Sequence, residues 1–168
     1  MKKVIFLLLS PLFAYAQDTI VKHSGDRLEK VKVVAVNDYS IVFTYPGETA
    51  TNTVGKAAVD KILFESGRVQ QITEYISTKG RDGWERVLIT DNPNEVIGLR
   101  RVGEVKSKAG GYWSFRSTKG SDRKATERIK KEVVELGGHV VFIQQHQTKG
   151  RAVYSNPESI QSGVAYGY

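Results

Sequence analysis

The chain of 168 residues contains no cysteine, one methionine, two tryptophans and four prolines. Without cysteine, disulfide bonds, thiol chemistry and cysteine-based zinc sites are excluded. We also expect no lipid anchor on an N-terminal cysteine, because Gln17 stands where that cysteine would be. After residue 16 no apolar run approaches the roughly 20 residues of a membrane-spanning helix, so no transmembrane span is expected. Burial of apolar side chains must hold the fold together.

The first 16 residues have the three parts of a cleavable signal peptide. Lys2 and Lys3 give a positive start, residues 4–9 form a short apolar stretch, and residues 14–16 read Ala-Tyr-Ala. Small residues at this spacing are typical of a cleavage site, which leaves Gln17 as the new N-terminus. We therefore expect an exported protein, either periplasmic or extracellular.

The mature chain has a moderate excess of basic residues. Loss of Lys2 and Lys3 with the signal peptide takes the formal charge from +7 to +5. A basic excess favours anionic surfaces such as lipid headgroups or acidic glycans. The charges are interspersed along residues 127–132, however, which argues against a dedicated stripe for a polyanion. Export also separates the protein from nucleic acid, and no nucleic-acid partner is expected.

Residues 17–74 read as a series of short strands. Val31, Val33 and Ala35 alternate with other residues, and Ile41 and Phe43 repeat this period of two after a turn. Strands this short and closely spaced predict a small β-barrel-like domain. Residues 75–83 are rich in turn formers and are expected to be a linker.

Residues 84–168 predict a β-β-α-β-β domain with one main helix on a sheet, which makes the fold class α+β. Strands are expected at 84–90, 96–107, 139–147 and 159–166, with a bulge near Arg100–Arg101. The helix is expected to have Ser121 or Asp122 as its N-cap and to end at Gly137–Gly138. Its buried face is predicted from the spacing of Ala125, Ile129, Val133 and Leu136.

The N-terminal pattern resembles an Sm-like or SH3-like barrel of exported Bacteroidota proteins. The resemblance rests on the Gly25–Asp26 turn and on residues 31–34, 38–43 and 59–67. It implies a small barrel, and no residues for stacking RNA bases accompany it.

The C-terminal pattern is similar to a family of small envelope domains. These include the outer-membrane sensor lipoprotein of the Rcs phosphorelay and the YbjQ-like proteins. The similarity rests on residues 96–105, on the helix that ends in Leu136-Gly137-Gly138, and on residues 139–143 and 163–166. The chain departs from the family at Val133–Val134 and Gly138. The resemblance therefore implies the fold and an envelope setting, and no specific signalling role.

No catalytic or metal-binding pattern stands out. His139 and His146 are an odd number of residues apart on one expected strand, so they point to opposite faces, and His23 is in the other module. The chain has no nucleophile elbow, and the phosphate-loop pattern is incomplete around Gly55–Lys56. We expect no metal, no cofactor and no enzymatic activity, with a hydrolase built from dispersed residues as the alternative.

The segment 106–119 mixes aromatic and basic residues. Tyr112, Trp113, Phe115 and Arg116 are the candidate partner-binding residues, because rings beside cations are typical of recognition surfaces. The alternative is that these rings close the core. The expected function is thus a non-catalytic envelope protein that contacts an unidentified protein partner, in envelope sensing or maintenance. A polyanion or cell-surface binder is the alternative. An exposed edge strand would pair two copies, but the sequence does not decide the oligomeric state.

Overall fold

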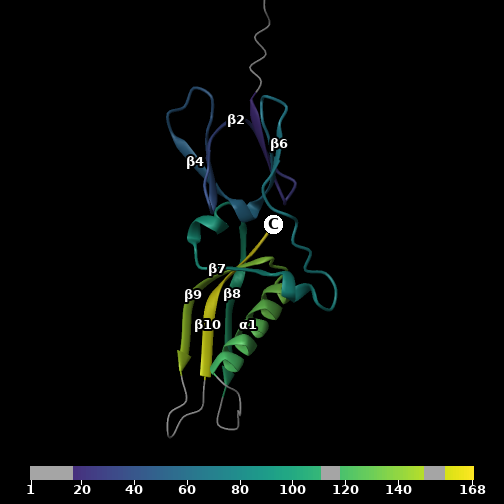
Figure 1. Ribbon diagram of the computed structural model, residues 1–168, viewed down its shortest axis with the longest axis vertical. Helices are drawn as coiled ribbons and strands as arrows, with labels where there is room; N and C mark the ends of the chain where they lie inside the picture. Colours follow the sequence, from purple (N-terminus) through teal and green to yellow (C-terminus); the bar gives the residue numbers. More distant parts are fainter. Residues whose placement is uncertain (1–16, 111–117, 150–157) are drawn as a thin grey trace, which may run out of the picture.

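The computed structural model describes residues 17–110, 118–149 and 158–168. The molecule is elongated, with one sheet at each end and the C-terminus between them (Figure 1). The described residues contain ten strands, three short 3₁₀ helices and a single α-helix, which confirms the α+β class. No helix in these three ranges is both long and apolar enough to cross a membrane.

The N-terminal sheet has six antiparallel strands in the order β4-β3-β2-β1-β5-β6. Glycines with positive φ at 25, 47 and 67 provide turns that join its strands, a conformation that other residues rarely adopt. The sheet bends so that β4 and β6 lie on opposite sides of its open end (Figure 1). Its strands are β1 (Asp18–Lys22), β2 (Arg27–Val36), β3 (Ser40–Thr44), β4 (Thr51–Gly55), β5 (Val59–Leu63) and β6 (Val69–Gln71).

Alternating apolar residues from these strands form the first core. Its largest fully buried side chains are Ile20, Ile41 and Ile62, which have no exposed surface. Burial of one such side chain contributes about 1.5–3 kcal/mol. The remaining buried members are Val31, Phe43, Val54, Ala58 and Val59. Val31 and Phe43 belong to the alternating positions that the sequence indicated.

The C-terminal sheet has four strands in the order β7-β9-β10-β8. Strand β10 pairs antiparallel with β8 and β9, whereas β7 runs parallel to β9. Helix α1 (Thr118–Glu135) packs on β8 and β10. The strands are β7 (Leu88–Thr90), β8 (Arg100–Gly110), β9 (Val140–Lys149) and β10 (Glu158–Gly167).

Three local predictions for this part were wrong. The expected strand at 84–90 begins with a 3₁₀ helix, η2 (Gly83–Arg86). The expected strand at 96–107 begins only at Arg100, because η3 (Pro93–Val96) and a turn at Gly98 come first. Helix α1 begins at Thr118, so Ser121 and Asp122 lie inside the helix and neither is its N-cap.

The second core joins the helix to the sheet. Ala125, Ile129 and Val133 are fully buried, as the spacing of four predicted. Leu136 is 42% exposed, because the helix has ended and Gly137 turns the chain with a φ of 72°. The expected bulge is present, since the β8–β10 register shifts between Arg101 and Gly103.

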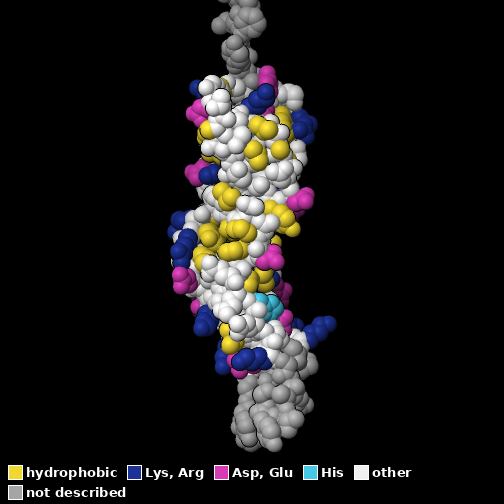
Figure 2. All heavy atoms as spheres, turned by 90° about the vertical axis from the view of Figure 1, so that its left-hand side faces the viewer, with side chains coloured by type: hydrophobic (Ala, Val, Ile, Leu, Met, Phe, Trp, Pro, Cys, Tyr) yellow, Lys and Arg dark blue, Asp and Glu magenta, His cyan; other side chains and the backbone are white. Residues whose placement is uncertain are grey.

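The two sheets are joined through two short 3₁₀ helices, η1 (Lys56–Ala58) and η3. A third cluster of buried residues combines Ala57 of η1, Val96 of η3 and Val140 of β9. The Gly55 N–H of β4 donates to the Ile97 carbonyl over 2.8 Å. A Cβ at Gly55 would overlap the Glu95 carbonyl, so the backbones meet only because this residue is glycine. On the face shown in Figure 2, hydrophobic side chains also gather around the middle of the molecule.

Candidate functional site

The predicted contact residues Tyr112, Trp113, Phe115 and Arg116 lie outside the described residues, and their role stays a prediction. The chain on either side of them lies at one end of the C-terminal sheet. The register aligns Glu158 with both Gly110 and Lys149. The last residues of β8 and β9 therefore lie beside the first residue of β10. This tip, where α1 also begins, is the end of the sheet farthest from the N-terminal sheet (Figure 1).

Cations surround this tip. Lys108, Lys119, Arg123 and Lys149 are exposed there. Lys108 forms an ion pair with Glu158 over 3.0 Å. Lys119 and Arg123 line a shallow cavity of about 420 Å³ at the start of α1. The arrangement provides a positive field at the tip.

A polar network next to the tip joins α1 to β9 and β10. Its centre is Asp122, whose Oδ1 accepts hydrogen bonds from three side chains. The donors are His146 Nε2 at 2.6 Å, Ser159 Oγ at 2.9 Å and Gln161 Nε2 at 3.1 Å. An ionised carboxylate only accepts hydrogen bonds, so Nε2 carries the proton of His146.

The network stabilises the charged form of Asp122. Burial raises the pKa of this carboxyl group, but the hydrogen bonds from His146, Ser159 and Gln161 together outweigh it and lower the pKa. Gln161 is 4% exposed and also bonds Thr126 over 2.9 Å. The side chains that hold Asp122 are therefore themselves held in place.

Ser159, His146 and Asp122 are the residue types of a hydrolase triad, but their geometry differs. In a triad the serine hydroxyl bonds the histidine, which removes its proton. Here Ser159 donates to Asp122 instead, and Ser159 has no exposed surface. This arrangement leaves the hydroxyl unactivated and out of reach of a substrate. The network joins helix to sheet.

A second cluster lies between the two sheets and was missed in the sequence. The rings of His23, Tyr75, His139 and Tyr168 come together there from four separate segments. Tyr168 contacts both histidines, with its ring centroid 4.7 Å from that of His23 and 4.4 Å from that of His139. Tyr75 completes the group, 5.3 Å from Tyr168. No spacing along the chain indicates this contact.

Both histidines of this cluster resist protonation. Burial lowers the pKa of His23, and Asp60 opposes that shift only in part. Burial also lowers the pKa of His139, with further contributions from His23 and Arg100. The Nδ1 atom of His139 is buried and has no hydrogen-bond partner among the described residues.

Burial affects the hydroxyl group of Tyr168 as well. Burial raises the pKa of Tyr168 to about 12, and a hydrogen bond with the Ile76 backbone opposes this shift. His23 Nε2 lies 2.8 Å from Thr73 Oγ1, and that hydroxyl donates to the Val59 carbonyl over 2.7 Å. The cluster is therefore fixed to the N-terminal sheet. Within the described ranges, no three histidine, aspartate or glutamate side chains converge to hold a metal ion.

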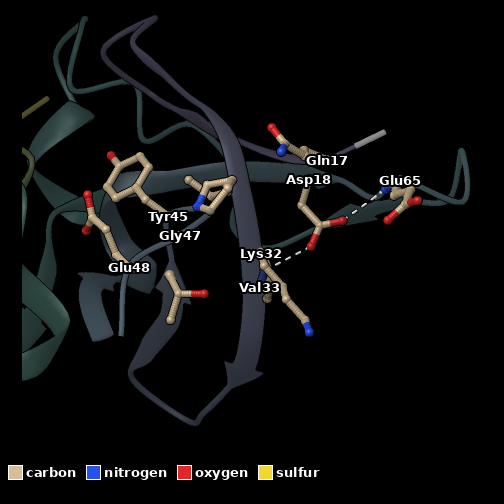
Figure 3. A pocket seen from close by; sticks show the side chains of 11 residues that line it. Gln17, Asp18, Lys32, Val33, Tyr45, Gly47, Glu48 and Glu65 are labelled. Carbon is tan, nitrogen blue, oxygen red and sulfur yellow. Dashed lines mark hydrogen bonds between the residues drawn. The ribbon is translucent and has the colours of Figure 1, made fainter. Parts of the chain in front are cut away.

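The open end of the N-terminal sheet holds a cavity of about 530 Å³. Asp18 and Glu65 lie on one side of it, and Tyr45 and Glu48 on the other (Figure 3). Lys32 extends away from these carboxylates (Figure 3). Both Asp18 oxygens accept backbone hydrogen bonds of 2.9 Å, from Val33 N–H and from Glu65 N–H. Asp18 therefore ties β1 to β2 and to the turn after β5.

Comparison with known proteins identifies no relative. No family model matches the chain, and neither the curated proteins nor the solved structures contain a significant match.

Proposed function

We propose that this chain is a non-catalytic, exported envelope protein that acts through contact with a partner protein at the tip of the C-terminal sheet. The observation that carries the proposal is the position of Gly110 and Thr118. Both residues flank the segment 111–117, and both lie at the exposed end of the molecule. Tyr112, Trp113, Phe115 and Arg116 are the proposed contact residues, and envelope sensing or maintenance is the proposed setting.

The absence of catalysis is part of this proposal. Its support is the geometry around Asp122. The Ser159 hydroxyl donates its hydrogen bond to the Asp122 carboxylate and not to His146, and His146 Nε2 also bonds that carboxylate. The Asp18 carboxylate in the N-terminal cavity has both oxygens engaged by backbone amides. Neither group resembles an activated nucleophile or a free general base.

The proposal also includes the organisation of the chain. It consists of a signal peptide at 1–16, a barrel-like module of the Sm or SH3 kind at 17–74, a linker at 75–83, and an envelope-type β-β-α-β-β module at 84–168. The bend of the N-terminal sheet supports the first module (Figure 1). The helix packed on β8 and β10 supports the second.

Site-specific photo-crosslinking tests this function. A photoreactive p-benzoylphenylalanine replaces Phe115 in the exported protein, and the matched control carries it at Val69. Val69 is 59% exposed and belongs to β6, at the opposite end of the molecule. We expect a discrete crosslinked product from position 115 only. Equal products at both positions, or none at 115, overturn the proposal.

The double variant Trp113→Ala, Phe115→Ala separates recognition from folding. We expect it to retain the melting temperature of the parent and to reduce formation of the crosslinked complex at least tenfold, with the photoreactive group placed at position 112. Loss of the cooperative melting transition would instead mean that these rings belong to the core, and the proposed contact surface would be wrong.

The second candidate is a polyanion binder, which the exposed Lys119, Arg123 and Lys149 favour. Binding to anionic vesicles then falls steeply as salt rises, because exposed charges are screened over about 8–10 Å at 0.1–0.15 M salt. Lys119→Glu with Arg123→Glu should abolish this binding, whereas Lys61→Glu on the other sheet should not. Binding that is insensitive to salt and to both variants rejects this candidate.

A further inference from the structure

The edges of the two sheets differ in how well they are guarded. An exposed edge strand presents unpaired N–H and C=O groups to other chains. Strands β6 and β7 are only three residues long, and β4 is tied to the Ile97 carbonyl through Gly55. Strand β8 is long but carries exposed charges of both signs, among them Arg101, Glu104 and Lys106. Short length and charge are the devices that keep edges apart.

The outer edge of β9 lacks this protection. Strand β7 pairs only with residues 140–142 of β9, so no described element covers the edge beyond Phe142. Residues 144–149 are all exposed. Their sequence, Gln-Gln-His-Gln-Thr-Lys, contains no proline and no acid, and its one lysine is the last residue.

The free edge has a defined regular length. The β9–β10 register shifts between Ile143 and Gln145, which places a bulge at Gln144. From Gln145 to Lys149 each residue has one partner on β10, so the outer edge is regular over this stretch. At about 3.4 Å per residue, it offers roughly 17 Å of backbone for pairing.

We infer that a second copy of this chain pairs with the β9 edge, strand to strand and antiparallel, about a two-fold axis at Gln147. This register uses the whole regular stretch, with Gln147 opposite its own copy and Gln145 opposite Lys149. His146 then lies opposite Thr148. No like charges face each other, and like charges directly opposite would destabilise the pair.

The two-fold pairing also brings compatible side chains together on each face of the paired strands. His146 faces α1 because it bonds Asp122, so Gln145, Gln147 and Lys149 share the opposite face of the strand. In the paired sheet these residues form a row of amides with a lysine at each end. The same surface serves both copies, which closes the assembly at a dimer.

A sedimentation series with the mature chain tests this inference. The contact is small, so we expect monomers at about 1 µM and mostly dimers near about 1 mM, as for weak interfaces. Gln147→Lys places two lysines opposite each other and should weaken association at least tenfold. Thr53→Lys, which adds the same charge at an exposed position of β4, should leave association unchanged.

A charge-exchange experiment fixes the register. Gln147→Glu alone should also weaken association, and an equimolar mixture of Gln147→Lys and Gln147→Glu should restore it, because lysine then faces glutamate. All variants should keep the parent melting temperature. Three results would each overturn the inference. The protein stays monomeric over the whole concentration range, Gln147→Lys leaves association unchanged, or the mixture of Gln147→Lys and Gln147→Glu does not associate.

Discussion

The ring of Tyr168 stacks on the imidazole of His139, with 4.4 Å between the centroids and 22° between the planes. The ring of His23 also contacts Tyr168, with 4.7 Å between the centroids and 44° between the planes. His23 belongs to the N-terminal part of the chain and His139 precedes β9, so the tyrosine connects the two sheets. Both histidines are partly buried in this contact, which makes their charge state a determinant of stability.

Stability should stay level from pH 8 to about 6.5 and then fall as the pH drops to 5. The pKa of both His23 and His139 is lowered from 6.5 in the folded protein, so the unfolded chain binds protons first. The stabilising contribution is complete above pH 6.5 and is lost as the pH falls through the folded pKa values. Melting temperatures across this range measure the loss. The double variant His23→Gln, His139→Gln should show a weaker dependence.

The carboxyl groups with lowered pKa values affect stability only at a lower pH than the two histidines do. Asp60 and Asp122 have pKa values lowered from 3.8, and hydrogen bonds from Lys124 and Lys131 lower the pKa of Glu127 to about 2. Their contributions are present above pH 4.5 and are lost only in stronger acid. A melting temperature that stays constant or rises between pH 8 and 5 would contradict the role assigned to the histidines.

Asp122→Ala should destabilise the C-terminal sheet by about 2 kcal/mol, because it removes a charged acceptor and leaves the Ser159 and Gln161 donors without it. Urea unfolding at pH 7 measures this loss. Asp122→Asn keeps one acceptor oxygen and should cost less. Arg123→Ala, an exposed neighbour in the same helix, is the control and should stay within about 0.5 kcal/mol of the parent. Equal stability of Asp122→Ala and the control would mean that the network is energetically unimportant.

Gly55→Ala should destabilise the junction by about 1–3 kcal/mol, because the added methyl group overlaps the Glu95 carbonyl and forces η3 away from β4. Thermal unfolding measures it. Thr53→Ala is the matched control, since its side chain is exposed two residues earlier in the same strand. A neutral Gly55→Ala would show that the two sheets tolerate displacement.

The proposed signal peptide predicts a mature protein that begins at Gln17. Intact mass spectrometry of the protein recovered from the cell envelope or medium should give the mass of residues 17–168. Substitution of Ala14 and Ala16 by leucine should block processing, because the cleavage site requires small residues. Recovery of the uncleaved chain from the cytoplasm would refute export.

Local patterns predicted local structure well. The spacing of Ala125, Ile129 and Val133 marked the buried helix face, and a break in alternation near Arg101 marked the bulge. The start of the helix was misplaced because Asp122 has the chemistry of an N-cap. Its carboxylate instead accepts hydrogen bonds from β9 and β10, a contact that depends on tertiary structure.

The junction cluster was beyond sequence reasoning for a similar reason. His23, Tyr75, His139 and Tyr168 are far apart along the chain, and each is an ordinary surface residue when read alone. Their approach follows from how the sheets pack, with Val96 and Ala57 in contact and Gly55 bonded to Ile97. The short parallel strand β7 was predicted as a longer strand from the apolar run that begins at Val87. In the structure Val87 and Leu88 are apolar because they pack into two of the buried clusters.

The central position of β10 has a consequence for the order of assembly. This strand lies between β9 and β8, yet its residues, 158–167, are the last of the four strands to be synthesised. Until they emerge, β8 and β9 have no neighbour in common and α1 lacks one of the two strands on which it mainly packs. The C-terminal sheet therefore cannot be completed before residues 158–167 have been synthesised. A nascent chain stalled before residue 158 should remain sensitive to protease throughout that region.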